Sequence, residues 1–313
     1  MPESILVTAR LPAGALQILR DAGEVHVAEA PLDPDALREQ ARGRSAIVCL
    51  LTDRIDADLL DAAGSSLRIV ANVAVGFDNI DRDAARERGV IVTNTSGVLT
   101  EAVAQFTWAL LLTVTRRVAE GDRLVRRGAW TGWAFDLLPG MELTGTLLGI
   151  VGAGRIGRAV AAKAPAFGMR VVFATRSAKE QVDGHPVISL DELLVSADVV
   201  SLHLPLTPDT RHLINRRTLA RMRRSAFLIN TSRGALVDED ALIWALEERL
   251  IAGAALDVYA NEPDVPPGLL ALEHVVLAPH IGSATRETRA AMAELAARNV
   301  AAVLQGQPPF TPV

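Results

Sequence analysis

The glycine motif GAGRIG at residues 152–157 constrains the fold most, because of what flanks it. The apolar run LLGIVG at 147–152 leads directly into it, and a helical pattern over 154–167 follows at once. In a strand–turn–helix of this kind Gly152 permits the tight turn, Gly154 lets the backbone approach a pyrophosphate, and Gly157 lets the helix pack close to the strand. The phosphates would then lie against amide donors at the start of the helix. The motif predicts a dinucleotide-binding βαβ unit; the alternative interpretation is a flexible turn without a ligand.

The rest of the second half continues this alternation of strands and helices. Apolar runs at 170–175, 199–204, 226–232, 251–259 and 274–279 are interspersed with helical patterns such as 238–248. Continuous apolar strands that alternate with helices are typical of a parallel sheet covered on both faces. We therefore expect a doubly wound α/β domain.

The first third of the chain shows the same alternation without a glycine-rich loop. Strands are predicted at 5–9, 25–28, 46–51, 68–73 and 90–94, and helices at 12–22, 34–42, 56–63 and 81–88. One long helix is predicted at 100–126, and the last helix, at 284–305, is long enough to return to the first domain. We expect two α/β domains, one from residues 1–98 with 286–313 and the other from 99–285.

Composition restricts the classes of ligand and compartment. The 313 residues suffice for two domains, and a net charge of -5 gives little attraction to nucleic acid or anionic lipid, so small ligands are expected. The single cysteine, Cys49, lies in an apolar run and is expected to be a buried packing residue in a reducing compartment. No apolar stretch approaches membrane-spanning length and no metal-spaced cluster is present, so we expect a cytoplasmic protein without a metal, nucleic-acid or membrane partner.

Thr175 stands at the end of the second strand of the βαβ unit, where an acid usually accepts hydrogen bonds from the adenosine ribose. Arg176 and Ser177 follow it. An acid would repel a 2′-phosphate, whereas a guanidinium and a hydroxyl can bind one. The stretch therefore favours NADPH over NADH. Alternatively, Arg176 is a solvated loop residue and NADH is held without the acid.

Ligands of a doubly wound sheet bind beyond the carboxyl ends of its strands. The polar residues found there in the second domain include His203, Ser232, Arg233, Asp257, Glu262 and His280. Arg233, Glu262 and His280 form a coherent set for the reduction of a 2-keto acid. The guanidinium can bind the substrate carboxylate, an imidazolium can protonate the carbonyl oxygen as hydride arrives, and a carboxylate beside the ring favours and orients its protonated form. Each also has a structural interpretation, and on spacing alone His203 competes with His280.

Seven segments resemble the family of D-isomer-specific 2-hydroxyacid dehydrogenases. They are VGFDNID (75–81), TNTSGVLTEAVA (93–104), GIVGAGRIGRAVA (149–161), HLPLTPDTRHLIN (203–215), INTSRGALVDEDAL (229–242), ALDVYANEP (255–263) and APHIGSAT (278–285). Position by position, the resemblance implies that Arg233 binds the carboxylate, Glu262 supports the histidine and His280 is the general acid. It also implies a flavodoxin-like substrate domain, a Rossmann cofactor domain and a homodimer held largely through the long helix and its flanking segment.

The resemblance further implies which residues bind the cofactor. The implied set is Thr100, Gly152, Gly154, Arg155, Ile156, Gly157, Thr175, Arg176, Ser177, His203, Leu204, Pro205, Thr210, Thr231, Ser232, Asp257 and Gly282. His203 is thereby assigned to the cofactor site and not to proton transfer.

Within the family, VANVAVGFDNID is similar to the glyoxylate and hydroxypyruvate reductase branch. This implies that the amides of Val75 and Gly76 hold the substrate carboxylate and that Leu51 limits the substrate's tail. Phosphoglycerate dehydrogenases usually place an arginine near Asn72, which argues against that substrate. The ATRS turn also resembles the NADPH-preferring reductases of this branch. Trp133 either packs at the dimer interface or reaches a neighbouring active site.

We therefore expect an NADPH-preferring reductase that converts glyoxylate or hydroxypyruvate to glycolate or D-glycerate. The alternatives with the same chemistry are reduction of 2-ketogluconate or another short 2-keto acid, oxidation of phosphoglycerate, and oxidation of phosphite with NAD. An alternative from another class is a non-catalytic binding protein that uses the nucleotide as an assembly ligand, as corepressors related to this family do. The compact chain argues against the last.

Overall fold

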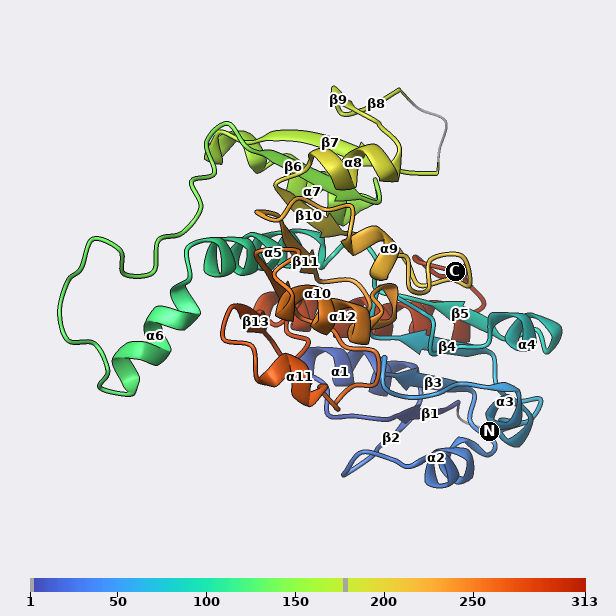
Figure 1. The fold of residues 1–313 in the computed structure, drawn as a ribbon. Coiled ribbons are helices and arrows are strands. Elements are labelled where there is room, and N and C mark those ends of the chain that lie inside the picture. The colour runs from blue at the N-terminus through green and yellow to red at the C-terminus, as the bar shows by residue number, and fades with distance from the viewer. Residues whose placement is uncertain (1–2, 177–179) are drawn as a thin grey trace. The chain divides into compact units, whose positions relative to one another are not determined.

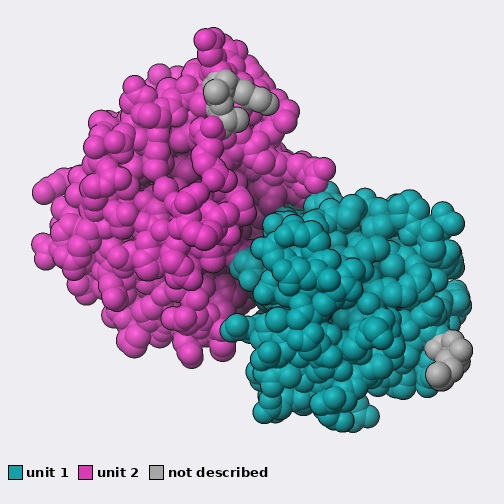
Figure 2. Space-filling view, turned by 90° about the vertical axis from the view of Figure 1, so that its right-hand side faces the viewer, with its two compact units in different colours: residues 1–99, 283–313 teal, residues 100–282 magenta. Residues whose placement is uncertain are grey.

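A computed structural model describes residues 3–176 and 180–313, which form two compact units (Figures 1 and 2). Unit 1 comprises residues 1–99 and 283–313, and unit 2 comprises residues 100–282. Each unit contains its own parallel sheet with helices, so the prediction of two doubly wound α/β sheets is confirmed. None of the helices among the described residues is both long and apolar enough to cross a membrane.

Unit 1 is built on five parallel strands in the order β2-β1-β3-β4-β5, the flavodoxin-like order. The strands are β1 (Ser4–Val7), β2 (Glu24–Val27), β3 (Ala46–Cys49), β4 (Ile69–Asn72) and β5 (Ile91–Thr93). The helices are α1 (Ala13–Ala22), α2 (Pro34–Ala41), α3 (Ala57–Ala63), α4 (Arg82–Glu87) and α12 (Arg286–Leu304). Because α12 packs on α1, β3 and β4, both ends of the chain build this unit.

Unit 2 is built on six parallel strands in the order β13-β12-β11-β10-β6-β7. The strands are β6 (Leu147–Val151), β7 (Arg170–Ala174), β10 (Val199–Leu202), β11 (Phe227–Asn230), β12 (Gly253–Leu256) and β13 (Val275–Leu277), with a separate hairpin of β8 (Gln181–Val182) and β9 (His185–Pro186). The helices are α5 (Thr100–Thr115), α6 (Val118–Arg126), α7 (Arg155–Ala161), η1 (Ala164–Phe167), α8 (Leu190–Ser196), α9 (Arg216–Leu219), η2 (Gly234–Leu236), α10 (Glu239–Glu247) and α11 (Pro267–Leu270).

The strand order of unit 2 locates the position where a nucleotide can bind. A parallel bridge from Phe173 to Val187 adds a one-residue strand outside β7, which reproduces the order of a Rossmann sheet. The direction of winding reverses between β6 and β10, which are hydrogen-bonded neighbours. In open α/β sheets ligands bind at this switch point, beyond the carboxyl ends of the strands.

The single helix predicted at 100–126 is wrong. The chain forms two helices, α5 and α6, and Arg117 between them has a left-handed φ of 55°. The amide of Met141 donates to the carbonyl of Thr115 at 2.8 Å, so this carbonyl is taken by a returning segment instead of by the next helical turn. The Arg117 guanidinium binds Glu120 at 2.7 Å on the far side of the break.

The helix predicted at 154–167 is also shorter than expected. It ends at Ala161 and is followed by the short 3-10 helix η1, in which Pro165 cannot donate the backbone hydrogen bond that a continuing α-helix needs. The elements β8, β9, α8, α9 and α11 lie in stretches to which the sequence analysis assigned no structure.

Candidate active site

His280 lies just after β13 in a backbone conformation that Asp257 fixes. Its φ of 54° is left-handed, which is unfavourable for a residue other than glycine. The amide of His280 donates to the carbonyl of Asp257 at 2.9 Å, and the Asp257 carboxylate accepts from the amides of Ile281 at 2.8 Å and Gly282 at 2.7 Å. Burial raises the pKa of the Asp257 carboxyl, and these two amides partly oppose the shift.

The ring of His280 is oriented by Glu262, which lies on the segment after β12. Nδ1 of His280 is 2.7 Å from Oε2 of Glu262, whose other oxygen accepts from the amide of Tyr259 at 3.0 Å. Partial burial alone would raise the pKa of Glu262. The hydrogen bonds from His280 and Tyr259, with attraction to His280 and Arg233, outweigh burial, so this pKa lies below its ordinary value of 4.5. An ionised carboxylate thus holds Nδ1 and leaves Nε2 for a substrate.

Arg233 follows β11 and lies at the same edge of the sheet as Glu262 and His280. Its Nη1 donates to the carbonyl of Ser232 at 2.8 Å, and its charge lowers the pKa of Glu262. Since β11, β12 and β13 are adjacent strands, their carboxyl ends bring Arg233, Glu262 and His280 to one place. The structure therefore groups the three residues that the sequence singled out for catalysis.

The glycine loop after β6 has the shape that a dinucleotide requires. Gly152 has a φ of 104°, and a Cβ there would lie 2.2 Å from the carbonyl oxygen of His203. A Cβ at Gly157 would lie 2.3 Å from the carbonyl oxygen of Gly152. By contrast, a Cβ at Gly154 would meet no atom within 4 Å. Packing accounts for the first and third glycines, and the space beside Gly154 fits a phosphate group.

Two further predicted cofactor residues, Arg155 and Ile156, begin α7 directly after Gly154. Both lie at the end of the helix where backbone amides lack intrahelical acceptors. This placement fits a pyrophosphate at the start of α7.

His203 lies beside the glycine loop, at the switch point between β6 and β10. Its Nε2 is 2.8 Å from Oγ of Ser201, and its Nδ1 is buried with no partner in the described part of the chain. Burial lowers the pKa of His203 to about 3, so the ring is neutral at physiological pH. A buried neutral ring is a poor proton donor, which distinguishes His203 from His280.

The loop after His203 carries Leu204 and Pro205. Oγ1 of Thr210 donates to the carbonyl of Pro205 at 2.8 Å and accepts from the amide of Thr207 at 2.8 Å. Thr210 therefore shapes this loop through its own hydrogen bonds.

Three further predicted cofactor residues lie at the start of α5 and at the end of β11. Thr100 is the first residue of α5. After β11, Oγ1 of Thr231 is 3.0 Å from Oγ1 of Thr107, and Oγ of Ser232 donates to the carbonyl of Leu202 at 2.8 Å. These two hydroxyls hold β11 against its neighbours.

At the end of β7, Thr175 is followed by Arg176, whose side chain is 74% exposed. Nη1 of Arg176 is 3.5 Å from Oδ2 of Asp209. Ser177 lies outside the described residues.

In unit 1, Val75 and Gly76 lie on the loop after β4 with their amides turned outward. The carbonyl of Ala74 accepts from the amide of Thr95 at 2.9 Å, and that of Val75 accepts from Nδ2 of Asn94 at 2.8 Å. In a trans peptide the N–H points opposite to the C=O. The amides of Val75 and Gly76 therefore point away from β5, and neither has an acceptor within the part of the chain that the structure describes.

Asparagine side chains that the sequence analysis did not assign to the site hold both loops of unit 1. Nδ2 of Asn72 donates to the carbonyl of Gly76 at 2.8 Å. Nδ2 of Asn79 donates to the carbonyls of Leu50 and Asp53 at 3.1 and 2.9 Å, which holds the loop carrying Leu51. The sequence did hold a signal for this role: Asn72 is a polar residue at the end of an apolar strand, and a polar side chain buried there needs hydrogen-bond partners.

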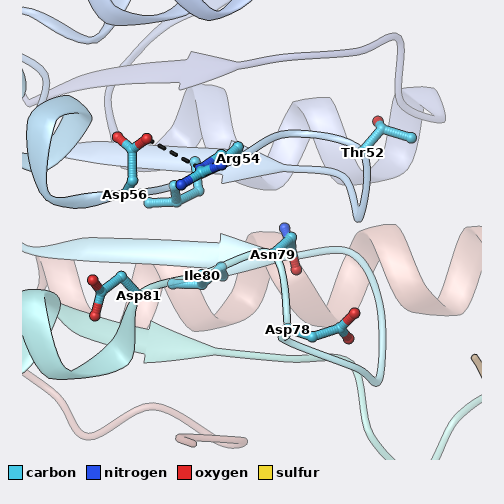
Figure 3. Close-up of a pocket in the computed structure, with 8 residues that line it drawn as sticks. Thr52, Arg54, Asp56, Asp78, Asn79, Ile80 and Asp81 are labelled. Carbon is cyan, nitrogen blue, oxygen red and sulfur yellow. Dashed lines mark ion pairs between the residues drawn. The ribbon is translucent and has the colours of Figure 1, made fainter. Parts of the chain in front are cut away.

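A cavity of about 380 Å³ in unit 1 lies between the loops after β3 and β4 (Figure 3). Its lining carries the carboxylates of Asp56, Asp78 and Asp81 and the guanidinium of Arg54, which contacts Asp56 at 3.2 Å. This excess of negative charge opposes the binding of a carboxylate substrate. We assign no ligand to this cavity.

Comparison with known proteins identifies the chain's relatives. The family model described as "D-isomer specific 2-hydroxyacid dehydrogenase, NAD binding domain" matches residues 108–282. The glyoxylate reductase of Aeropyrum pernix is 50% identical over 97% of this chain and 94% of its own.

Two solved structures are also similar. One, from Thermus thermophilus, has a TM-score of 0.93 and 51% identity over 99% of each chain. The other, the NADPH-dependent glyoxylate/hydroxypyruvate reductase of Sinorhizobium meliloti in complex with NADP and malonate, has a TM-score of 0.91 and 36% identity over 99% of this chain and 96% of its own. The chain therefore belongs to the family of D-isomer-specific 2-hydroxyacid dehydrogenases and is an NAD(P)-dependent oxidoreductase.

Proposed function

We propose that this protein is an NADPH-preferring reductase of glyoxylate and hydroxypyruvate, which yields glycolate and D-glycerate, with His280 as the general acid. The observation that carries the proposal is the contact of 2.7 Å between His280 and an ionised Glu262, at the carboxyl edge of the sheet that also holds the glycine loop. The relatives from Aeropyrum pernix and Sinorhizobium meliloti, a glyoxylate reductase and a glyoxylate/hydroxypyruvate reductase, support the choice of substrates.

In the proposed reaction each charged group has a separate task. Arg233 and the amides of Val75 and Gly76 bind the substrate carboxylate, and Leu51 limits the length of the tail. Nε2 of His280 donates a proton to the carbonyl oxygen while Glu262 balances the charge of the imidazolium at Nδ1. When bound, the reduced nicotinamide supplies the hydride that adds to the carbonyl carbon.

The cofactor would be held through the glycine loop and the end of β7. Backbone amides at the start of α7 would bind the pyrophosphate beside Gly154, where no side chain is present to obstruct it. Thr175 carries no negative charge that would repel a 2′-phosphate, and the exposed side chain of Arg176 can turn toward such a phosphate. The NADP complex of the Sinorhizobium meliloti relative is consistent with this choice.

We also propose that the protein is a homodimer held through α6 and the segment that follows it. Helix α6 and the segment after it extend away from the sheet of unit 2 (Figure 1). Helix α6 has no buried residue, and every residue from 125 to 137 is exposed. This segment includes Trp133, 83% exposed, and Phe135, 92% exposed. Such large apolar surface on one segment is typical of an interface, and a second copy of the chain would cover it.

Replacing His280 with asparagine tests the general acid. His280→Asn should lower kcat for glyoxylate about a hundredfold or more, because the proton donor is lost, while the dissociation constant of NADPH stays within about twofold. Steady-state rates and NADPH fluorescence titration measure the two effects, with His185→Asn as the control. Near-wild-type turnover in His280→Asn would remove the histidine from this role.

Replacing Glu262 with glutamine tests whether its carboxylate favours the protonated ring of His280. Reduction requires a proton on the ring, so its rate falls as pH rises. A hydrogen-bonded carboxylate favours the protonated ring, so without it this fall should move to lower pH. The pKa of Glu262 lies below its ordinary value, so the carboxylate is ionised at neutral pH. The pH profile of kcat/KM measures the shift. The nearby exposed Asp264→Asn is the control, and a profile unchanged in Glu262→Gln would contradict the role.

Replacing Arg176 with alanine tests the preference for NADPH. Arg176→Ala should lower kcat/KM for NADPH about tenfold, through the loss of a charge-assisted contact, and leave that for NADH unchanged. Initial rates on glyoxylate and hydroxypyruvate with each nucleotide measure this. Arg170→Ala, at the exposed opposite end of β7, is the control. A preference that survives in Arg176→Ala would assign the residue to the solvated surface.

Removing the aromatic side chains of the exposed segment tests the dimer. The double variant Trp133→Ser/Phe135→Ser should sediment as a monomer, while the wild type and Phe310→Ser, exposed elsewhere, sediment as dimers. Circular dichroism checks that each variant is folded. A monomeric wild type, or a double variant that keeps the dimer mass, would contradict the proposal.

A further inference from the structure

The segment Tyr259–Glu262 carries Glu262 to His280 and has a second anchor. Besides the bond from the Tyr259 amide to Glu262, the amide of Ala260 donates to Oε1 of Glu239 at 2.9 Å. Glu239 is the first residue of α10 and lies 21 positions earlier in the chain. Its carboxylate therefore joins the start of α10 to the segment that presents Glu262.

Two further contacts, with Gly234 and with Ala278, confine the same segment. A Cβ on Gly234 would lie 1.9 Å from the carbonyl carbon of Tyr259 and 2.3 Å from the nitrogen of Ala260, so the peptide passes directly over the residue after Arg233. The hydroxyl of Tyr259 donates to the carbonyl of Ala278 at 3.0 Å, two positions before His280. The Glu239 bond is the side-chain contact that holds the middle of the segment.

Helix capping does not account for Glu239. The N-cap of α10 is Asp238, whose Oδ1 accepts from the amide of Ala241 at 3.1 Å. The start of the helix is thus already stabilised, and the Glu239 carboxylate binds outside the helix.

The surroundings of Glu239 oppose its charge. Burial raises the pKa of Glu239, and the nearby carboxylates of Asp240 and Glu262 raise it further, against the Ala260 hydrogen bond and the attraction of His212. Glu262 itself faces Glu239, Asp257, Arg233 and His280. The Glu239 carboxylate thus contacts the segment although its surroundings disfavour a second negative charge beside Glu262.

We propose that Glu239 is a positioning residue: through the Ala260 amide it holds the segment so that Glu262 meets Nδ1 of His280. This role rests on the proposed reductase function. Glu239 acts through Glu262 and does not itself touch the substrate or the cofactor. Its contribution should therefore disappear when Glu262 is absent.

A double-mutant cycle tests this dependence on the full-length protein. Glu239→Ala should lower kcat for glyoxylate about tenfold, because a small displacement of a catalytic group is costly, and should leave NADPH affinity within about twofold. In a Glu262→Ala background the same change should alter kcat less than about twofold. Glu239→Gln, which keeps an oxygen for the Ala260 amide, should restore most of the rate. The matched control is Asp240→Ala, exposed in the same helical turn, with kcat near that of wild type.

The outcomes separate this role from the proposed function. Equal fold-losses on Glu239→Ala with and without Glu262 would overturn the positioning role in a protein that is otherwise an active reductase. So would a Glu239→Ala variant with wild-type kcat, or a Glu239→Gln variant as impaired as the alanine variant. A wild-type protein that reduces neither glyoxylate nor hydroxypyruvate with either nucleotide would overturn the proposed function, and this role with it.

Discussion

The hydrogen bond between Glu262 and His280 is the interaction on which the site of unit 2 depends. Main-chain contacts hold the backbone on both sides of this pair. Asp257 holds the left-handed turn at His280 through one carbonyl and two carboxylate contacts. The Tyr259 amide and Gly234 fix the opposite side. The pair is thus preorganised by hydrogen bonds and close contacts of the surrounding main chain.

The same sheet holds two histidines in different electrostatic surroundings. His280 faces an ionised carboxylate, whereas His203 is buried beside the glycine loop with a neutral ring and contacts no carboxylate among residues 3–176 and 180–313. Burial without a countercharge disfavours the imidazolium, and a hydrogen-bonded carboxylate favours it. Residue type and position at a strand end do not distinguish the two; the presence of Glu262 does.

The sequence predicted much of the fold because its parallel strands are buried on both faces. The strand from Phe227 to Asn230, for example, is wholly buried and is part of an apolar run. Local signals failed where tertiary contacts decide. The helix break at Arg117 depends on a bond from Met141 to Thr115, and the Glu239 contact spans 21 positions. The capping box of α8, formed by Ser189 and Glu192, was a local signal that could have been used.

The threonine at position 175, where an acidic residue is usual, does not by itself select a nucleotide. The absence of a carboxylate there removes one source of repulsion of a 2′-phosphate and leaves the proposed preference for NADPH to Arg176. Arg176 is 3.5 Å from Asp209, and both side chains are well exposed. Exposed ion pairs of this kind contribute about 0–1 kcal/mol, so little is lost when the guanidinium turns to a phosphate that carries more charge than the carboxylate. With NADH the pair with Asp209 would simply persist. Under the proposed assignment, discrimination between the two nucleotides at this turn would depend on what Arg176 gains from the phosphate.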